Sequence, residues 1–273
     1  MSLYVKMTNW TSYEMLEISE DKSRWQMISV TGLAPGKMQT NWTKLAGHDG
    51  AILNSANLPT RNIVITLALH SDFEAARDAI SLVAVPGERV RLEIATVYPF
   101  VYTPDHKILL IDGVIDSVEY NPFSKNQETV QISVVCGCPY FLLIGQQVVT
   151  KEGNVFTNNG GLPAGYSITQ FNMPATSKAT LRLQDSRGTR DMVINHTFSA
   201  GSSLRIEVDP FRDNTNVYTN GPDDEDVSIL ADVADDFEFC LLRGGQATTV
   251  TLLNANNTSL TYTASISAYS LGV

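Results

Sequence analysis

Apolar residues alternate with polar ones in many short segments of this 273-residue chain, and only one segment has helical spacing. The clearest alternation is Arg61–Leu69, which is rich in β-branched residues and predicts a half-buried strand. Residues 15–33, Arg89–Thr96, Lys107–Val118 and Thr129–Cys136 predict further strands. The first half is therefore expected to be a β-rich barrel or sandwich with one helix.

The single helix is predicted at about residues 71–84. Ser71 is followed three residues later by Glu74, which fits a capping box. Pro86-Gly87 provides a stop signal. Between these signals lies an apolar stripe at helical spacing, which is expected to pack on the core: Phe73, Ala76, Ile80 and Val83.

Three segments depart from the regular strand pattern. Asp112-Gly113 lies inside an apolar run and predicts a bulge or tight bend. Asn121-Pro122-Phe123-Ser124 has the composition of a loop. Residues 35–60 are long, polar and weakly patterned, with Trp42 and Leu45 isolated among Gly, Asn, Thr and Lys. We expect an extended loop or hairpin arm there, because long irregular stretches in folded domains are usually functional or disordered.

The second half of the chain predicts a β-sandwich without a helix of useful length. Short apolar segments recur at intervals of about ten residues after the turn cluster Asn158-Asn159-Gly160-Gly161. The domain boundary is expected within residues 142–153, which gives domains 1–145 and 146–273. The predicted strands are Ser167–Phe171, Ala179–Gln184, Asp191–Phe198, Ser203–Val208, Val217–Thr219, Phe237–Leu242, Ala247–Leu253 and Leu260–Ala268.

The charge of the chain argues against direct binding of nucleic acid. The net charge is −10, and Lys and Arg form no cluster in either half. A protein that neutralises DNA phosphates needs such clusters, whereas an acidic surface repels DNA and suits a conduit. No secretory signal is visible, and no stretch reaches the roughly 18 apolar residues of a membrane helix. We expect synthesis in a cytoplasm and no membrane partner.

No segment has the pattern of a catalytic, cofactor or metal site. Cys136-Gly137-Cys138 is too tightly spaced for an ordinary zinc site, and the four histidines lack metal-binding spacing. A nucleophile elbow and a phosphate-binding glycine loop are also missing. Asp223-Asp224-Glu225-Asp226 could bind calcium, but it lacks EF-hand spacing and is expected to be a solvated loop.

Several short motifs follow one another along the first half of the chain: Ile28–Pro35, His48–Gly50, Arg61–Ile65, Pro86–Glu88, Ile111–Val118, Asn121–Phe123 and Ile132–Phe141. Their order resembles the distal tail protein family of long-tailed phages that infect Gram-positive bacteria. Within these motifs, the positions that we single out are Gly32, Asp49, Gly50, Arg61, Asn62, Asp112, Gly113, Cys136 and Pro139. In the second half, Phe156–Gly160 opens a domain that resembles the C-terminal domain of the family, and Phe198–Ser202 and Leu242–Gly245 fall where such domains place turns. Gln246 departs from the Asn-containing motif that ends the second of these turns in many relatives.

The resemblance implies a structural protein at the tip of a phage or prophage tail, and no enzyme. Its N-terminal domain would form a six-membered ring between the tail tube protein and the tail-associated hub protein, and DNA would pass through without specific binding. Its C-terminal domain would be galectin-like and could carry receptor-binding or baseplate proteins. In such a ring, Trp42 and Leu45 of the arm would contact a neighbouring copy.

Two other functions remain open from the sequence. A carbohydrate-binding module for host cell-wall glycans would suit a galectin-like sandwich, but residues 146–273 contain no Trp for sugar stacking. An enzyme such as a wall hydrolase would need a dispersed site, which sequence reading can miss.

Overall fold

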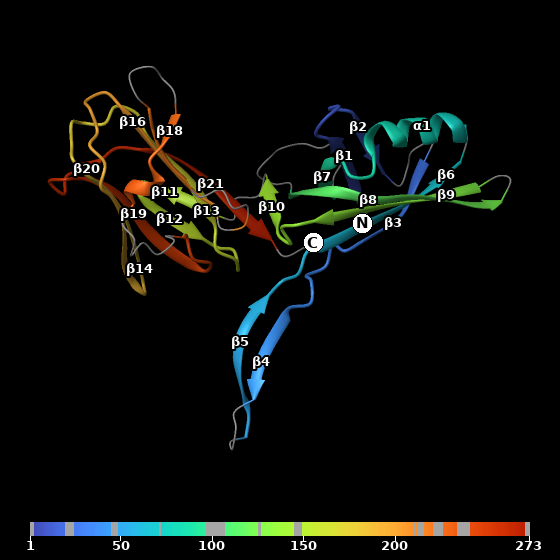
Figure 1. The fold of residues 1–273 in the computed structure, drawn as a ribbon, viewed down its shortest axis with the longest axis horizontal. Helices are drawn as coiled ribbons and strands as arrows, with labels where there is room; N and C mark the ends of the chain where they lie inside the picture. Colours follow the sequence, from blue (N-terminus) through green and yellow to red (C-terminus); the bar gives the residue numbers. More distant parts are fainter. Residues whose placement is uncertain are drawn as a thin grey trace. The chain divides into compact units, whose positions relative to one another are not determined.

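The computed structural model of the chain describes residues 3–19, 25–44, 49–70, 72–96, 107–124, 127–144, 149–209, 211, 216–220, 226–233 and 241–270. The chain divides into two compact units (Figure 1). Unit 1 is Met1–Gln146 with Ser270–Val273, and unit 2 is Gln147–Tyr269. Both units consist mainly of strands, which confirms the predicted mainly-β fold.

Unit 1 has one helix and ten strands among its described residues. The helix is α1 (Phe73–Val83). The strands are β1 (Tyr4–Asn9), β2 (Met15–Ile18), β3 (Trp25–Thr31), β4 (Gln39–Lys44), β5 (Ala51–Asn57), β6 (Arg61–Leu69), β7 (Arg89–Ala95), β8 (Ile108–Ser124), β9 (Gln127–Cys136) and β10 (Phe141–Ile144).

The long strand β8 connects the two halves of the unit 1 sheet. Its first part pairs with β7 and β10, and β7 continues through β1 to β2. Its second part pairs with β9, which continues through β6 to β3. All of these pairs are antiparallel. Because β8 pairs with β7 and β10 in its first part and with β9 in its second part, it belongs to both halves of the sheet.

The alternation of β6 places its apolar side chains in the core of unit 1. Ile63, Ile65 and Leu67 are fully buried, while Asn62, which precedes them, is exposed and Val64 and Thr66 between them are partly exposed. Helix α1 covers this core with its predicted apolar stripe, from which Ala76 and Ile80 are fully buried. Burying each large aliphatic side chain contributes about 1.5–3 kcal/mol, so the alternating pattern of β6 stabilises unit 1 substantially.

The start of α1 differs from the predicted capping box. Asp72 is the N-cap residue, and its side chain accepts a hydrogen bond from the backbone N–H of Ala75 at 3.4 Å. Asp is as good an N-cap as Ser, and the helix begins at Phe73. The capping-box prediction was therefore wrong by one position; Ser71 itself lies outside the described residues.

Two further local predictions in β8 were wrong. The backbone of Asp112-Gly113 pairs with β7 in continuous register, and the bulge lies instead between Ile115 and Ser117. The predicted loop at Asn121–Ser124 belongs to the strand, because β8 and β9 pair as far as Ser124 and Gln127. A register shift after Pro122 accommodates the proline, which cannot donate to the ladder.

Unit 2 is built from strands and one short 3-10 turn among its described residues. The turn is η1 (Leu230–Asp232). The strands are β11 (Val149–Glu152), β12 (Val155–Asn158), β13 (Gly165–Gln170), β14 (Ala179–Asp185), β15 (Gly188–Ile194), β16 (Ser203–Val208), β17 (Asn216–Asn220), β18 (Asp226–Ser228), β19 (Gln246–Asn254), β20 (Ser259–Leu260) and β21 (Thr263–Ser270). Phe237–Cys240 of one predicted strand lie outside the described residues.

Two antiparallel sheets of unit 2 share one apolar core. One sheet has the order β18-β17-β16-β13-β21, and the other has the order β11-β12-β19-β14-β15 with β20 beside β19. Ile168 and Ile206 from the first sheet and Leu181 and Leu252 from the second belong to the same buried cluster. This arrangement is a β-sandwich.

Candidate assembly site at the base of the arm

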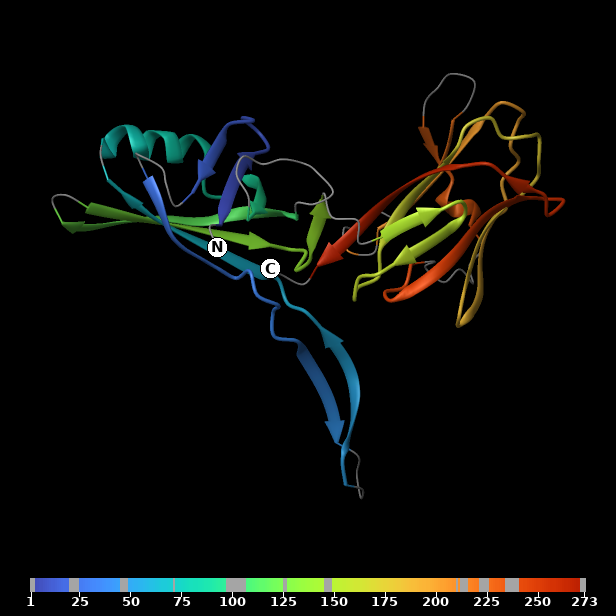
Figure 2. The same ribbon diagram turned by 180° about the vertical axis from the view of Figure 1, so that it is seen from behind.

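We call residues 35–60 the arm, and they include the two-stranded antiparallel hairpin of β4 and β5. Every residue of both strands is exposed. In two opposite views the arm extends away from the sheet of unit 1 (Figures 1 and 2). It leaves that sheet after Gly32 and returns to it at Arg61. A two-stranded hairpin alone is at best marginally stable in water, so the arm needs a surface to pack against.

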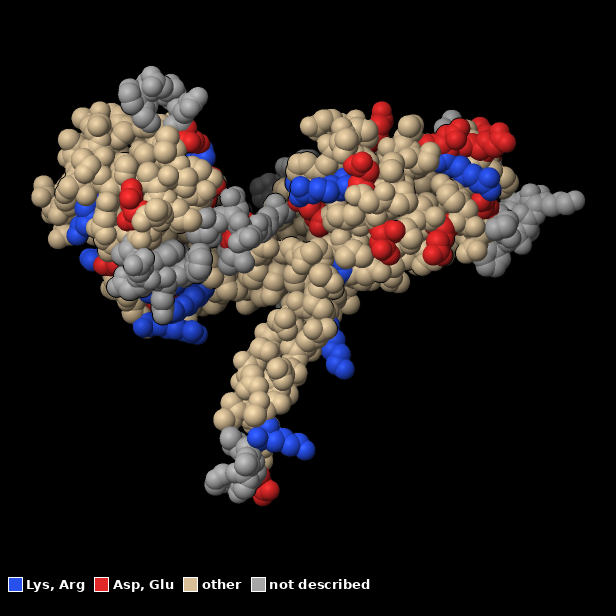
Figure 3. All heavy atoms as spheres, in the orientation of Figure 1, with Lys and Arg blue, Asp and Glu red and all other residues tan. Residues whose placement is uncertain are grey.

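The arm carries large apolar side chains that no other part of the described chain covers. Trp42 pairs across the strands with Leu53, and their exposed fractions are 55% and 44%. Met38 and Ile52 are 52% and 54% exposed. In Figure 3 the described part of the arm carries few charged side chains. Such an exposed apolar surface is typical of a protein contact. Leu45, the other predicted contact residue, lies outside the described residues.

Arg61 holds the base of the arm in place. This residue is only 6% exposed, at the first position of β6. Its Nε donates a hydrogen bond to the carbonyl of Pro139 at 2.8 Å, and its Nη1 donates to the carbonyls of Gly32 at 2.7 Å and Ala34 at 3.0 Å. The guanidinium also lies over the ring of Phe141, 4.6 Å from its centroid. The guanidinium of Arg61, at the end of the arm, is thus hydrogen-bonded both to the segment before the arm (Gly32 and Ala34) and to the segment before β10 (Pro139).

Gly32 is required at the point where the chain turns into the arm. Its φ is +83°, which favours glycine. A Cβ at this position would lie 2.0 Å from the carbonyl oxygen of Asn62. The Asn62 side chain in turn accepts a hydrogen bond from the Ser133 hydroxyl at 3.0 Å. Any other residue at position 32 would therefore push the arm away from β6.

Gly113 allows β8 to approach the residues behind Arg61. A Cβ on Gly113 would lie 2.7 Å from the Cγ1 of Val134 and 2.9 Å from the Sγ of Cys136. Cys136 is the partner of Arg61 in the β6–β9 register. Burial raises the pKa of the Cys136 thiol to about 12, although Arg61 opposes this shift, so the thiol is protonated at neutral pH. Its role here is packing, since a thiol is a much weaker nucleophile than a thiolate.

The structure thus brings together five of the nine predicted motif positions at the base of the arm: Gly32, Arg61, Asn62, Cys136 and Pro139. Gly113 packs directly behind them. Asp112 faces Arg91 instead, in an ion pair of 2.8 Å. Asp49 and Gly50 precede β5 at the far end of the hairpin.

A cavity of about 310 Å³ opens beside these residues, between the two ends of the arm. Its walls include Pro35, Pro59 and Thr60 together with Arg61 and Pro139. Two prolines stiffen the segments where the chain enters and leaves the arm, because proline fixes φ. This arrangement can hold the hairpin in one orientation relative to the sheet of unit 1.

The remaining polar motifs form no metal site in the described part of the chain. No group of three or more His, Cys, Asp or Glu side chains comes together there. Asp226 forms an ion pair with Arg205 at 2.6 Å, whereas Asp223–Glu225 lie outside the described residues, as do His48 and His106. Among the residues with described positions, no helix is long and apolar enough to span a bilayer.

One pair of polar residues was missed by the sequence reading. His196 and Asp232 lie 2.7 Å apart in unit 2, at Nδ1 and Oδ2. They are separated by 36 residues and by three strands, so no spacing pattern could have indicated their contact.

No protein-family model matches the sequence, and a search of curated proteins finds no match either. Solved structures, however, share the fold over nearly the whole chain. The Dit protein of phage SPP1, described as a paradigm of the hub adsorption apparatus in phages infecting Gram-positive bacteria, matches with a TM-score of 0.64. The match covers 97% of this chain and 99% of that one at 11% identity.

Two structures of the phage P2 baseplate in its activated conformation also match, one with Ca and one with Sr. Both have a TM-score of 0.51 and cover 98% of each chain, at 12% and 13% identity. At these identities the likeness concerns the fold. The fold is that of phage hub and baseplate proteins, as the sequence motifs predicted.

Proposed function

We propose that this chain is a structural subunit of a phage or prophage tail tip. Six copies would form a ring that joins the tail tube protein to the tail-associated hub protein and to baseplate or receptor-binding proteins. The observation that carries the proposal is the extent of the fold likeness, which covers 97% of this chain and 99% of SPP1 Dit. Because both units are included, the likeness goes beyond a single common β-sandwich.

The arm supplies the contact between neighbouring copies. A ring needs two different faces on each subunit, and a projecting hairpin that docks on the next copy fulfils this need. The described arm carries Lys37, Lys44 and Asp49, while the whole chain has a net charge of −10. Weak electrostatic attraction therefore favours docking of the arm on the body of another copy.

The energy of each contact can be estimated from Trp42. An aromatic side chain buries about 150–250 Å² in total, and Trp42 is 55% exposed in the isolated chain. Covering that part would remove roughly 100 Å² of apolar surface from water, which contributes about 2–3 kcal/mol per contact. Closing a ring adds effective concentration to each contact.

The same proposal gives the ring a passive lumen and no catalytic activity. An acidic chain without clusters of Lys and Arg lets DNA pass without gripping it. The protein would be made in the cytoplasm of the bacterial host and reside in the virion tail tip. A carbohydrate-binding role of unit 2 is the alternative.

Light scattering behind a sizing column tests the ring. One chain has a mass of 29.9 kDa, so six copies give about 179 kDa. We expect particles near that mass with ring-shaped images, either alone or after mixing with the tube and hub proteins. A chain that stays monomeric and binds neither protein would contradict the proposal.

The substitution Trp42→Ser isolates the role of the arm. It should weaken ring formation while the circular dichroism spectrum stays that of the folded chain, because the side chain is exposed in the monomer. Phe171→Ser is the matched control, since Phe171 is an aromatic residue of unit 2 that is 65% exposed, against 55% for Trp42. A Trp42→Ser protein that assembles normally would remove the arm from the proposal.

A further inference from the structure

The sheet of unit 1 has a second face, opposite the one that α1 covers. Strands β3, β6 and β9 bury alternate side chains, such as Met27, Ile65 and Ile132, in the core that α1 shares. The side chains between them point to the other side of the sheet. In Figures 1 and 2 the arm leaves the sheet on this other side, away from α1.

We call this second surface the open face, and it presents no charged side chain on β3, β6 or β9. The only charged residues of these strands are Arg61 and Glu128, which are 6% and 3% exposed. A solvated face of an antiparallel sheet is usually polar, whereas charged side chains are depleted at the centre of protein interfaces. The composition therefore favours a protein contact. The exposed or partly exposed residues of the open face are Ile28, Asn62, Val64, Thr66, Val114, Gln131 and Val135.

Two acidic residues of β8 border the open face. Asp116 and Glu119 are both exposed. Asp116 accepts a hydrogen bond from the hydroxyl of Ser133 at 3.5 Å, and Glu119 pairs with Gln131 across β8 and β9. The two carboxylates therefore lie on the same side of the sheet as the open face, at its margin.

The arm has the matching distribution of charge. Its two strands contain a single charged residue, Lys44, while Lys37 precedes them and Asp49 lies at the far end of the hairpin. Trp42 and Leu53 pair across the strands and so share one side of the hairpin. An apolar centre with mainly basic ends thus corresponds to an uncharged face with an acidic margin.

The arm is also long enough to cross the open face. The six residues of β4 extend about 20 Å, at roughly 3.3 Å per residue. Strands β3, β6, β9 and β8 are neighbours in one sheet, and at a spacing of about 4.8 Å they span roughly 14 Å from the first to the last. A two-stranded ribbon can therefore pack across all four strands, as sheets do when they pack face to face.

We propose that the open face of one copy receives the arm of the next copy. The apolar side of the arm packs on Val64 and Val135, and the lysines of the arm lie beside Asp116 and Glu119. This inference rests on the proposed ring and names the surface that its arm contacts. An acidic wall would suit the passage of DNA better than this uncharged face does, which favours the arm as its occupant.

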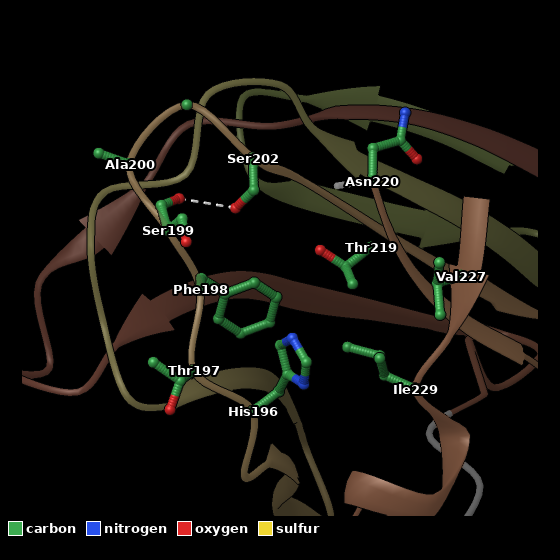
Figure 4. A pocket seen from close by; sticks show the side chains of 11 residues that line it. His196, Thr197, Phe198, Ser199, Ala200, Ser202, Thr219, Asn220, Val227 and Ile229 are labelled. Atoms are coloured by element: carbon green, nitrogen blue, oxygen red, sulfur yellow. Dashed lines mark hydrogen bonds between the residues drawn. The ribbon is translucent and has the colours of Figure 1, made fainter. Parts of the chain in front are cut away.

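The cavity of about 430 Å³ beside His196 in unit 2 is a poorer partner for the arm (Figure 4). Phe198 and Ile229 on its wall are only 2% and 6% exposed. Covering them would remove little further apolar surface from water, so the exposed ring of Trp42 would gain little from this contact.

Charge reversal in the full chain tests the contact. An arm variant carries Lys37→Glu and Lys44→Glu, and a face variant carries Asp116→Lys and Glu119→Lys. Each variant alone should need about a tenfold higher concentration to assemble, because like charges then meet. An equimolar mixture should assemble as the parent chain does, because each arm then finds a face of opposite charge on the other variant. Light scattering behind a sizing column measures assembly, at one ionic strength for all samples.

A helix variant, Glu74→Lys with Asp78→Lys, is the matched control, since both residues are exposed on α1. It should assemble as the parent does and should not restore assembly of the arm variant. Circular dichroism establishes that each variant is folded. If the parent assembles but the face variant does so equally well, or if the mixture of arm and face variants stays apart, the arm docks elsewhere and only this inference is overturned. A parent chain that assembles under no condition, including with the tube and hub proteins, overturns the ring and this contact together.

Discussion

Replacing Arg61 by Ala should destabilise unit 1 strongly, because three segments of that unit depend on one guanidinium. The substitution removes the hydrogen bonds to the carbonyls of Pro139, Gly32 and Ala34. It also removes the stacking of the cation on Phe141. The carbonyls at the base of the arm then lose a partner that water can replace only in part.

The magnitude follows from the number of bonds and their burial. A hydrogen bond from a charged donor contributes about 1.5–3 kcal/mol, and the three bonds are not additive because they share one group. Water can enter the adjacent cavity of about 310 Å³ and recover some of the loss. We therefore expect the free energy of unfolding of unit 1 to fall by about 3–5 kcal/mol. Arg61→Lys keeps the positive charge but loses the planar guanidinium with its several N–H donors. It should lower the free energy of unfolding by about half as much.

Tryptophan fluorescence makes this loss measurable in unit 1 alone. The only tryptophans of the chain are Trp10, Trp25 and Trp42, and all of them precede residue 147. Denaturant unfolding followed by fluorescence therefore reports unit 1, while circular dichroism reports both units. The protein concentration is kept the same for every variant, because assembly would shift the midpoint.

Arg182→Ala provides the matched control in unit 2. Arg182 makes two hydrogen bonds to Asp191 at 2.8 and 2.7 Å, but the side chains are 42% and 33% exposed. An exposed pair contributes at most about 1 kcal/mol, and its loss should leave the fluorescence transition unchanged. If Arg61→Ala shifted that transition no more than Arg182→Ala does, the reasoning that Arg61 organises the base of the arm would be refuted.

Three other perturbations give distinct outcomes. Gly32→Ala should lower the free energy of unfolding of unit 1 by about 3 kcal/mol or more in the same fluorescence assay, since its Cβ would lie 2.0 Å from the carbonyl oxygen of Asn62. Gly87→Ala is the control, because Gly87 has a similar φ of +88° but open space around it. It should lower that free energy by only about 1–2 kcal/mol. Burial alone would raise the pKa of Asp185, but a backbone N–H and two arginines outweigh it and lower the pKa below 3.8. The stability that Asp185 provides is therefore present above pH 3.8 and lost as the pH falls further. In an acid titration followed by circular dichroism, Asp185→Asn should lose less stability between neutral and acid pH than the parent chain does. Burial raises the pKa of Tyr262 to about 12, so its contribution is present below pH 10 and lost as the pH rises through 12; Tyr262→Phe should remove one late step from the tyrosinate absorbance titration.

Local patterns in the sequence were sufficient for the main elements of unit 1. The alternation of Arg61–Leu69 determined β6 and the face that it buries, because side chains alternate across a strand. The helical stripe of Ala76, Ile80 and Val83 likewise determined which face of α1 enters the core. The lack of any period in residues 35–60 indicated a segment outside the core, where both strands of the arm are exposed.

Choices that depend on a partner strand could not be made from local patterns. Asn121–Ser124 has loop composition, yet pairing with β9 keeps it in a strand. Gly113 looked like a bulge, but the close approach of Val134 and Cys136 explains the glycine. In both places the neighbour that decides the conformation lies elsewhere in the chain, and its distance is set by packing.

The candidate sites show the same division between sequence and tertiary structure. The sequence by itself determined that Gly32, Arg61 and Pro139 belong to motifs, and that an isolated Trp42 interrupts a polar segment. Only the tertiary structure decided that the Arg61 guanidinium reaches Pro139, 78 residues away, and so holds the arm. It also placed His196 against Asp232 at the edge of a cavity. The physical reason is that alternation and capping act over a few residues, whereas hydrogen bonds and cavities form between segments that chain folding brings together.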